Sequence, residues 1–347
     1  MTISNSYTDV RMPAEWEPQD AVLLAWPDPQ GDWGPILAEI EGVMVEIIRH
    51  ASAFEKIVIA APDPHRPASV LRSSGISLEN IHLYAVANND TWARDFGPIT
   101  VEADGNTVLY DFCFNGWGLK YPANLDNQIN RSLAVQGAWK VPLQPQGLVL
   151  EGGSIESDGE GTLLTTAGCL LSPRRNPQLD KYAIEQRLRH TLGAKRILWL
   201  NQGSLAGDDT DGHIDTLARL CPQDTLVYVR CDDPTDEHFA PLRAMEEELQ
   251  EFRTSTGAGY RLLPLPWPQP KFNPEHERLP ATYANYLVIN GAVLVPTYAD
   301  PADPVALEVI ASAYPEREII GIDCSSVILQ HGSLHCLTMQ LPKGILA

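Results

Sequence analysis

The chain has 347 residues, which corresponds to about two domains of roughly 150 residues or to one large repeat-built or barrel domain. Apolar residues make up 44% of it, so it can bury a sizeable core and disorder is not expected. Its 25 basic and 45 acidic residues give a net charge of −20, which argues against nucleic acid and anionic membranes as partners, because both attract basic proteins.

Strand-like and helix-like stretches alternate along the chain, with no linker or low-complexity tract between them. Apolar residues from Ile36 to Ile48 recur at three- and four-residue spacing, which predicts an amphipathic helix. Short β-branched runs predict strands at 56–60, 107–112, 196–200, 225–229 and 318–322, and a last strand at 336–341. Further helices are predicted at 178–192, 239–252 and 304–313. The pattern predicts an α/β or α+β fold.

The compartment is predicted from the N-terminus and the cysteines. Residues 1–20 contain no basic stretch followed by an apolar one, so no signal peptide is expected. No apolar run approaches the ~18–20 residues of a membrane span. The six cysteines include no C-x-x-C pair, and in a chain of this length they favour reduced thiols in a cytoplasmic protein.

Three Gly-Ser pairs each follow an apolar, strand-like stretch: Gly153-Ser154, Gly203-Ser204 and Gly332-Ser333. Glycine at a strand end permits a tight turn or a close approach to a ligand. The pairs are therefore candidates for three strand ends that line one site, although Gly-Ser is also common in ordinary turns.

The densest polar cluster, residues 207–215, reads GDDTDGHID. A calcium loop is excluded, because aligning its second glycine with the sixth loop position puts Gly207 and Ala218 where oxygen-bearing side chains are required. An acidic turn that caps the next apolar run remains. His213 and Asp215, two residues apart, are expected to share a strand face. A carboxylate beside an imidazole suits a general acid or base, although such pairs also occur as plain salt bridges.

The segment 330–336, QHGSLHC, places Cys336 after a turn that contains glycine. Such a thiol is a candidate nucleophile when a histidine and a carboxylate occur elsewhere, and the alternative is a core cysteine on the last strand. Zinc binding by His331, His335 and Cys336 is disfavoured, because their spacing matches none of the common zinc patterns.

Two further clusters combine acidic and aromatic side chains or end a strand. Asp95 lies close to Trp92 in NDTWARDFGP, and Glu151 ends the strand-like run in LEGGS. Carboxylates accept the N–H donors of a planar cation, and an aromatic face stacks on its plane. Alternatively, Asp95 forms a local ion pair with Arg94, and Glu151 caps a turn. With the His–Asp pair and the thiol, these groups describe attack on a guanidinium, loss of ammonia, and hydrolysis of a thiouronium intermediate to a urea.

Seven motifs resemble those of agmatine deiminases and the related bacterial peptidylarginine-deiminase-like proteins: 11–18 (RMPAEWEP), 89–98, 114–118 (FNGWG), 150–154, 207–215, 283–286 (YANY) and 334–336 (LHC). This resemblance implies the pentein fold of guanidino-group-modifying enzymes, a five-bladed pseudo-symmetric α/β propeller with the site on its axis. It implies a single domain over residues 1–347 in place of two, with neither a metal nor an organic cofactor.

The resemblance also implies a role for each of six residues: Cys336 as nucleophile, His213 as general acid and base, Asp95 and Glu151 as guanidinium ligands, Asp215 at the substrate or orienting the imidazole, and Trp92 as a pocket wall. The family usually carries a glycine-rich stretch before its His-Cys pair. Here His331 and Ser333 interrupt that stretch, and a Cβ at either position is expected to affect substrate choice.

The leading hypothesis is a cytoplasmic agmatine deiminase that produces N-carbamoylputrescine and ammonia for putrescine and polyamine biosynthesis. A deiminase of peptidylarginine or of a free arginine derivative is the nearest alternative. Amidino transfer to another acceptor, and a non-catalytic propeller that binds cationic ligands, are further ones. The oligomeric state is open, a homo-oligomer included.

Overall fold

The computed structural model describes residues 7–346. The apolar repeat between Ile36 and Ile48 forms α1 (Leu37–Ala51), whose buried face includes Ile40 and Met44. The predicted strands are present as β3 (Lys56–Ala61), β6 (Asn106–Cys113), β10 (Arg196–Leu200), β12 (Thr225–Val229) and β16 (Glu318–Asp323). The other predicted helices are α7 (Lys181–Leu192), α8 (Phe239–Glu251) and α9 (Asp303–Ala313). Periodicity therefore predicted these elements correctly.

The strands of the described residues form five sheets, in the orders β1-β5-β6-β7, β10-β9-β8, β11-β12-β13, β14-β15-β16 and β17-β2-β3-β4. The remaining strands are β1 (Val10–Arg11), β2 (Gln19–Ala25), β4 (Ile81–Ala85), β5 (Ile99–Ala103), β7 (Leu143–Val149), β8 (Ile155–Ser157), β9 (Thr162–Thr166), β11 (Ala218–Cys221), β13 (Arg261–Leu265), β14 (Leu287–Ile289), β15 (Ala292–Thr297) and β17 (Thr338–Pro342).

Every sheet repeats one pattern, an antiparallel pair whose second strand has a parallel neighbour: β5-β6-β7, β8-β9-β10, β11-β12-β13, β14-β15-β16 and β17-β2-β3. A parallel neighbour cannot be reached by a hairpin, and the helices supply the crossovers. For example, α8 joins β12 to β13 and α9 joins β15 to β16. The chain is therefore an α/β protein.

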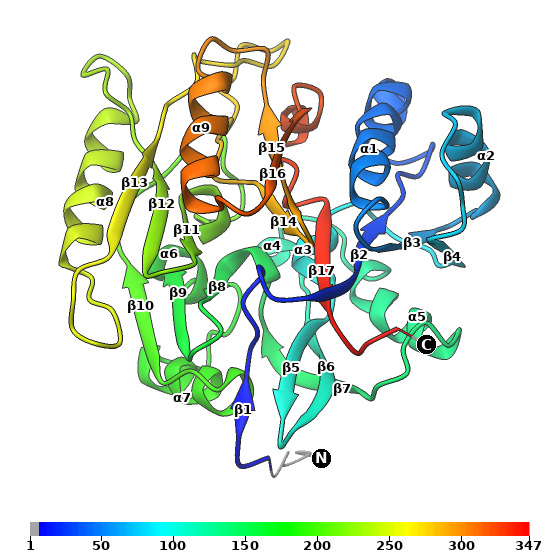
Figure 1. Ribbon diagram of the computed structural model, residues 1–347, viewed down its shortest axis with the longest axis horizontal. Helices are drawn as coiled ribbons and strands as arrows, with labels where there is room; N and C mark the ends of the chain where they lie inside the picture. Colours follow the sequence, from blue (N-terminus) through cyan, green and yellow to red (C-terminus); the bar gives the residue numbers. More distant parts are fainter. Residues whose placement is uncertain (1–6, 347) are drawn as a thin grey trace.

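The fifth sheet joins the two ends of the chain. β17 runs antiparallel to β2, with Thr338 opposite Leu24, and Figure 1 shows these strands side by side. The short helices are α2 (His65–Ser73), α3 (Ala93–Phe96), α4 (Gly116–Leu119), α5 (Ile129–Val135) and α6 (Ala167–Leu170), with 3-10 turns η1 (Gly34–Ile36), η2 (Asp126–Gln128), η3 (Gly152–Ser154), η4 (Ile214–Thr216) and η5 (Val327–Gln330). Figure 1 shows α3 near the middle of the molecule and α2 and α8 at its periphery. None of the helices between residues 7 and 346 has the length and apolarity of a membrane span.

Three local predictions were wrong. The last strand begins at Thr338, so Cys336 lies in the turn before it. His213 and Asp215 share no strand face, because the chain turns at η4, where the Thr216 hydroxyl donates to the His213 carbonyl oxygen at 2.8 Å. The third Gly-Ser pair follows η5 and not a strand.

Candidate functional site

Short turns, each directly before the first strand of an antiparallel pair, bring the polar side chains of the site together. They carry Asp95 in α3 before β5, Glu151 before η3 and β8, His213 and Asp215 at η4 before β11, Asn285 before β14, and Cys336 before β17. The turns also pack on one another, since α3 contacts η3 and η3 contacts η4. Each of the five sheets therefore contributes one turn to the site.

Asp95 is a buried carboxylate held by two donors. Its Oδ2 accepts a hydrogen bond from Trp117 Nε1 at 2.8 Å, and its Oδ1 accepts one from the Gly153 amide at 3.0 Å. Burial raises the pKa of Asp95 to about 6, an effect that His213 opposes and Asp215 reinforces. The two donors fix the carboxylate in place, and its charge is costly until a cation binds beside it.

His213 lies between two carboxylates. Its Nδ1 is 3.5 Å from Asp95 Oδ1, and its Nε2 is 3.6 Å from Glu151 Oε2. Neither ring nitrogen has a hydrogen-bond partner, and the residue is fully buried. Burial alone would lower the pKa of His213, but Asp95, Cys169 and Glu151 together raise it well above its usual value. The ring is therefore an imidazolium that can donate a proton.

Glu151 is held by a buried arginine. Arg175 Nε lies 2.7 Å and 2.9 Å from the two carboxylate oxygens, and Arg175 also binds Asp211 at 2.6 Å. Burial would raise the pKa of Glu151, but His213 and Arg175 lower it below its usual value. Glu151 is therefore an anion at neutral pH, and the structure does not use it as a turn cap.

Asp215 is fully buried, and its two oxygens differ. Oδ2 is 2.7 Å from His335 Nδ1, whereas Oδ1 has no hydrogen-bond partner. Burial acts to raise its pKa, but His335 and His213 lower it below the usual value. An ionised carboxylate with one free oxygen can accept a hydrogen bond from a bound cation.

Cys336 is buried, with its Sγ 3.4 Å from Asn285 Oδ1. Burial and the charges of Asp215 and Asp95 raise its pKa well above that of a free thiol. The same carboxylates favour a bound cation, and a cation beside the sulfur favours the thiolate. Binding of a cation in this site would therefore favour the thiolate form of Cys336.

Gly153 makes the approach of these groups possible. A Cβ at this position would lie 2.6 Å from His213 Nδ1, 2.8 Å from Asp95 Oδ1 and 3.2 Å from Asp215 Oδ2. The first of the three Gly-Ser pairs thus borders the site as expected. Gly332 also does, because a Cβ there would overlap the Trp92 ring, whereas Gly203 packs against Met245 of α8.

A cavity of about 240 Å³ opens onto this cluster. Cys336, Asp95 and Trp92 line it, and so do Trp117 and Tyr121. Its other acidic lining residues are Asp32, Asp90, Asp208 and Asp209, and no lysine or arginine is among the described residues that line it. Cations are the ligands that such a cavity favours.

The two residues that interrupt the glycine-rich stretch lie differently. His331 lines the cavity in a left-handed conformation, with φ of 67°, and its Nδ1 is 2.7 Å from the Gly207 carbonyl oxygen. Ser333 is buried, with its Oγ 2.9 Å from the Tyr298 hydroxyl. Only His331 therefore contributes a side chain to the cavity wall.

The zinc hypothesis receives no geometric support. His331 faces Gly207, and His335 faces Asp215 and Glu15, so the proposed ligands point to different partners. The local Arg94–Asp95 ion pair is also not formed, because Arg94 NH2 lies 3.9 Å from Glu15 and Arg94 NH1 binds Gln340.

Several residues of the site were not predicted as such from the sequence. Arg175 follows another arginine in an irregular loop, where neither spacing nor polarity distinguishes a buried ion pair. Cys169, 3.6 Å from Glu151, reads as a core residue. Glu15, Trp117 and Asn285 do fall within the motifs at 11–18, 114–118 and 283–286, so those motifs were the available signal.

Comparison with known proteins gives a consistent result. Residues 11–342 match the family model described as Porphyromonas-type peptidyl-arginine deiminase. The agmatine deiminase of Pseudomonas syringae pv. tomato is 33% identical over 355 residues, which cover 95% of each chain. A substrate-bound cysteine-to-serine variant of the C. jejuni agmatine deiminase is 38% identical, with a TM-score of 0.89 over 96% of this chain and 97% of that one.

A Porphyromonas gingivalis structure that is provisionally named an arginine deiminase is 48% identical, with a TM-score of 0.93 over 98% of this chain and all of that one. More distant structures show the fold alone. They are an amidinotransferase from Microseira wollei, 12% identical with a TM-score of 0.55, and a dimethylarginine dimethylaminohydrolase, 11% identical with a TM-score of 0.51. They share the α/β fold of this chain over 97% and 93% of its length.

Proposed function

Because the chain belongs to the Porphyromonas-type peptidyl-arginine deiminase family, and so to the hydrolases that act on C–N bonds of amidines, we propose that it converts agmatine to N-carbamoylputrescine and ammonia. The charge of the cavity carries this proposal. Four aspartates line it in addition to Asp95, with no lysine or arginine among its described lining residues. They attract the second cation of agmatine and repel the α-carboxylate of free arginine.

A peptidylarginine or arginine-derivative deiminase is the second candidate. The P. gingivalis structure that is named an arginine deiminase favours it by its 48% identity. A peptide would bring neutral amide groups to the acidic lining, where they gain less than an ammonium group does. Amidino transfer is supported only by the similar fold of an amidinotransferase that is 12% identical in sequence. A non-catalytic role would not account for Cys336 and His213 in the site.

In the proposed mechanism, Asp95 and Glu151 bind the guanidinium, whose charge stabilises the Cys336 thiolate, and the thiol proton is released to water. The sulfur attacks the central carbon, and His213 donates its proton to the departing nitrogen, which leaves as ammonia. The remaining thiouronium is attacked by water, whose proton the now neutral His213 accepts. The C–S bond then breaks, which regenerates the thiolate, and the ureido product loses its extra proton to water. The substrate-bound cysteine-to-serine variant of the C. jejuni relative supports a role for the thiol.

We also infer the finer features of the fold and of the cellular role. Five sheets with one common strand pattern, each contributing a turn to the site, support a single-domain five-bladed propeller. The larger core cluster draws buried side chains from Ala21 to Leu346, which supports one domain. The proposed substrate and the six free cysteines support a cytoplasmic enzyme of putrescine biosynthesis, and the net charge of −20 argues against nucleic acid and anionic membranes as partners.

The purified protein tests the proposal when it is incubated with agmatine, with arginine and with a peptidylarginine, and both ammonia and ureido product are measured. We expect agmatine to give the highest kcat/KM. Preference for a peptidylarginine would move the assignment to the second candidate. Absence of ureido product from all three would reject deimination of these substrates.

Cys336→Ala is expected to abolish turnover, because no other thiol is among the described residues that line the cavity, while agmatine still binds to Asp95 and Glu151. Single-turnover kinetics and calorimetry measure the two effects. Cys113→Ala is the matched control, since Cys113 lies on β6 with its Sγ on the Gln146 carbonyl oxygen. Normal turnover by Cys336→Ala would show that Cys336 is not the nucleophile.

A further inference from the structure

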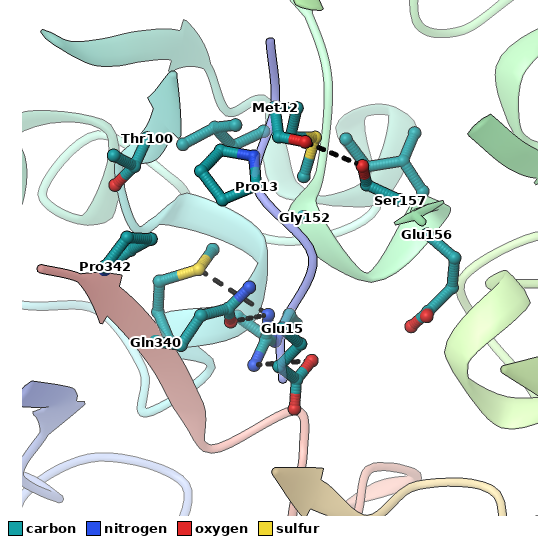
Figure 2. Close-up of a pocket in the computed structure, with 13 residues that line it drawn as sticks. Met12, Pro13, Glu15, Thr100, Gly152, Glu156, Ser157, Gln340 and Pro342 are labelled. Atoms are coloured by element: carbon teal, nitrogen blue, oxygen red, sulfur yellow. Dashed lines mark hydrogen bonds and ion pairs between the residues drawn. The ribbon is translucent and has the colours of Figure 1, made fainter. Parts of the chain in front are cut away.

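A buried chain of two carboxyl groups and one imidazole runs from the site to the side of a second, smaller pocket. It begins at Asp215 and passes through His335, whose Nδ1 lies 2.7 Å from Asp215 Oδ2. His335 Nε2 is 2.8 Å from Glu15 Oε2. Figure 2 shows Glu15 among the residues that line a small pocket on this side, together with Gln340 and Glu156. The chain thus links the first motif of the sequence to the last.

The Glu15 end of the chain is rigidly held. Glu15 Oε1 accepts a hydrogen bond from the Val288 amide at 2.7 Å, and its Oε2 accepts one from Arg219 NH2 at 2.8 Å. Arg219 itself binds Glu156 and donates to the Tyr286 carbonyl oxygen at 2.6 Å. These groups belong to four of the five sheets or the turns beside them, so the position of Glu15 is fixed by the fold as a whole.

The His335 ring connects the fixed Glu15 carboxylate to Asp215 and holds Asp215 in place in either of its protonation states. If the ring is charged, it donates to both carboxylates. If it is neutral, Nδ1 still carries the proton for Asp215, because Nε2 can accept from Arg219 NH2 at 3.1 Å. In both states one oxygen of Asp215 is fixed by a donor, and the other, Oδ1, stays buried without a hydrogen-bond partner.

A second ligand site is a poor explanation for these residues. Glu15, Glu156 and His335 have the spacing of a metal-binding group, but the Arg219 guanidinium binds both carboxylates and lies 3.1 Å from the histidine. A guanidinium in that place repels a metal ion. The adjoining pocket measures about 30 Å³, which leaves room for no more than about two water molecules.

We propose that Glu15 and His335 are positioning residues, which hold Asp215 by a carboxylate–imidazole–carboxylate chain so that its free Oδ1 meets the guanidinium of the substrate. The proposal deepens the proposed function and rests on it for its kinetic test. A displacement of about 1 Å in a substrate-contacting group can cost about a hundredfold in rate. Loosening the chain should therefore lower activity without loss of the fold.

Glu15→Gln tests the proposal with the smallest change, since the amide keeps the shape of the carboxylate and weakens its bonds to His335 and Arg219. We expect kcat/KM for agmatine to fall about 10- to 100-fold, with the melting temperature much less affected. Glu41→Gln is the control. Glu41, on helix α1, is a buried carboxylate that pairs with Arg66 of helix α2. Loss of activity that only follows loss of stability, or no loss at all, would overturn the proposal.

Two variants of His335 separate positioning from packing. His335→Asn removes volume but keeps a donor near the place of Nδ1, whereas His335→Leu fills the volume and has no donor. Positioning predicts higher activity for His335→Asn, and packing predicts higher activity for His335→Leu. If neither folds, Glu15→Gln still decides.

A crystal structure of Glu15→Gln provides a reading that needs no substrate. Asp215 is expected to shift or to occupy two conformers, and an unmoved Asp215 overturns the inference. If the native protein does not act on agmatine, the proposed function fails, and this structure still decides whether Glu15 positions Asp215.

Discussion

At the scale of single residues, the site is a group of charges that the fold holds apart from water. Burial favours the neutral form of Asp95 and of Cys336, and neighbouring carboxylates favour the charged form of His213. These preferences suit a site that awaits a cation. Perturbed titration is typical of catalytic groups, because the charge that is costly in the empty site is the one that stabilises the bound state.

The pKa of Asp95, about 6, predicts a pH dependence of binding. Below pH 6 the carboxyl takes up a proton and loses its attraction for a guanidinium, whereas above pH 6 it is ionised. Agmatine affinity of Cys336→Ala, measured by calorimetry, is therefore expected to be about tenfold weaker at pH 5 than at pH 7.5. The lowered pKa of Glu151 keeps that group ionised over this range.

Asp95→Asn in the same background is the control for this titration. It should bind agmatine weakly at each pH, with no decline between pH 7.5 and pH 5. Equal affinity of the Asp95 form at the two pH values would contradict the assignment of Asp95 as a guanidinium ligand that titrates near pH 6.

At the scale of elements, the site is made by turns and not by strands. Each turn lies between the last strand of one sheet and the antiparallel pair of the next, so its backbone donors are free to bind side chains, as the Gly153 amide binds Asp95. Small residues permit this density. Gly153 faces His213, and Gly332 faces Trp92, with no space for a Cβ at either position.

Gly153→Ala is expected to lower kcat/KM by at least about tenfold, because the new Cβ displaces His213 or Asp95, which lie 2.6 and 2.8 Å from its position. Steady-state kinetics with agmatine and a thermal melt measure the effect. Gly147→Ala on β7 is the matched control, since a Cβ there meets nothing within 4 Å. Equal activity of the two variants would show that the cluster tolerates a wider spacing.

At the scale of the whole molecule, two strands that lie far apart in the sequence, β2 and β17, pair in one sheet. β17 supplies the antiparallel partner of β2, and Leu341 on β17 is fully buried opposite Ala21. The paired strands are separated by almost the entire sequence, so bringing them together costs conformational entropy. Burial of side chains has to offset that cost. Integrity of the site therefore depends on contacts made by the last residues of the chain.

Leu341→Ala is expected to lower the free energy of unfolding by about 2–5 kcal/mol, through lost burial and the cavity that it leaves. Urea unfolding measures this loss. Lys343→Ala, an exposed position two residues on, should leave the free energy of unfolding almost unchanged. A similar small effect of both variants would mean that the fifth sheet does not need β17 for stability.

The sequence predicted those features that have a local signature. The three- and four-residue spacing in α1 and the β-branched runs of β3 and β12 record which faces are buried, so these elements were predicted correctly. Asp95, Glu151, His213, Asp215 and Cys336 were brought together by chemistry and by resemblance, and the structure places them in one cluster. Their assigned roles stay predictions.

Other features depend on distant contacts and have no local periodicity. Nothing near Arg175 indicates that it binds Glu151, and nothing near Glu15 indicates His335, because the partners lie 24 and 320 residues apart in the sequence. The strand face expected for His213 and Asp215 was wrong for a related reason. Two polar residues separated by one apolar residue are compatible with a strand and with a 3-10 turn. The spacing of His213 and Asp215 alone does not distinguish the two.

The order of the turns along the chain has a consequence for biosynthesis. The ribosome synthesises Asp95, Glu151 and His213 well before Cys336. The turn that carries Cys336 precedes β17, a strand of the fifth sheet. Under the proposed roles, a nascent chain acquires its guanidinium ligands before it acquires the nucleophilic thiol. Under the proposed roles, chains that end before Cys336 are expected to lack deiminase activity, and in a refolding experiment ammonia release is expected to return only after the turn that carries Cys336 has formed.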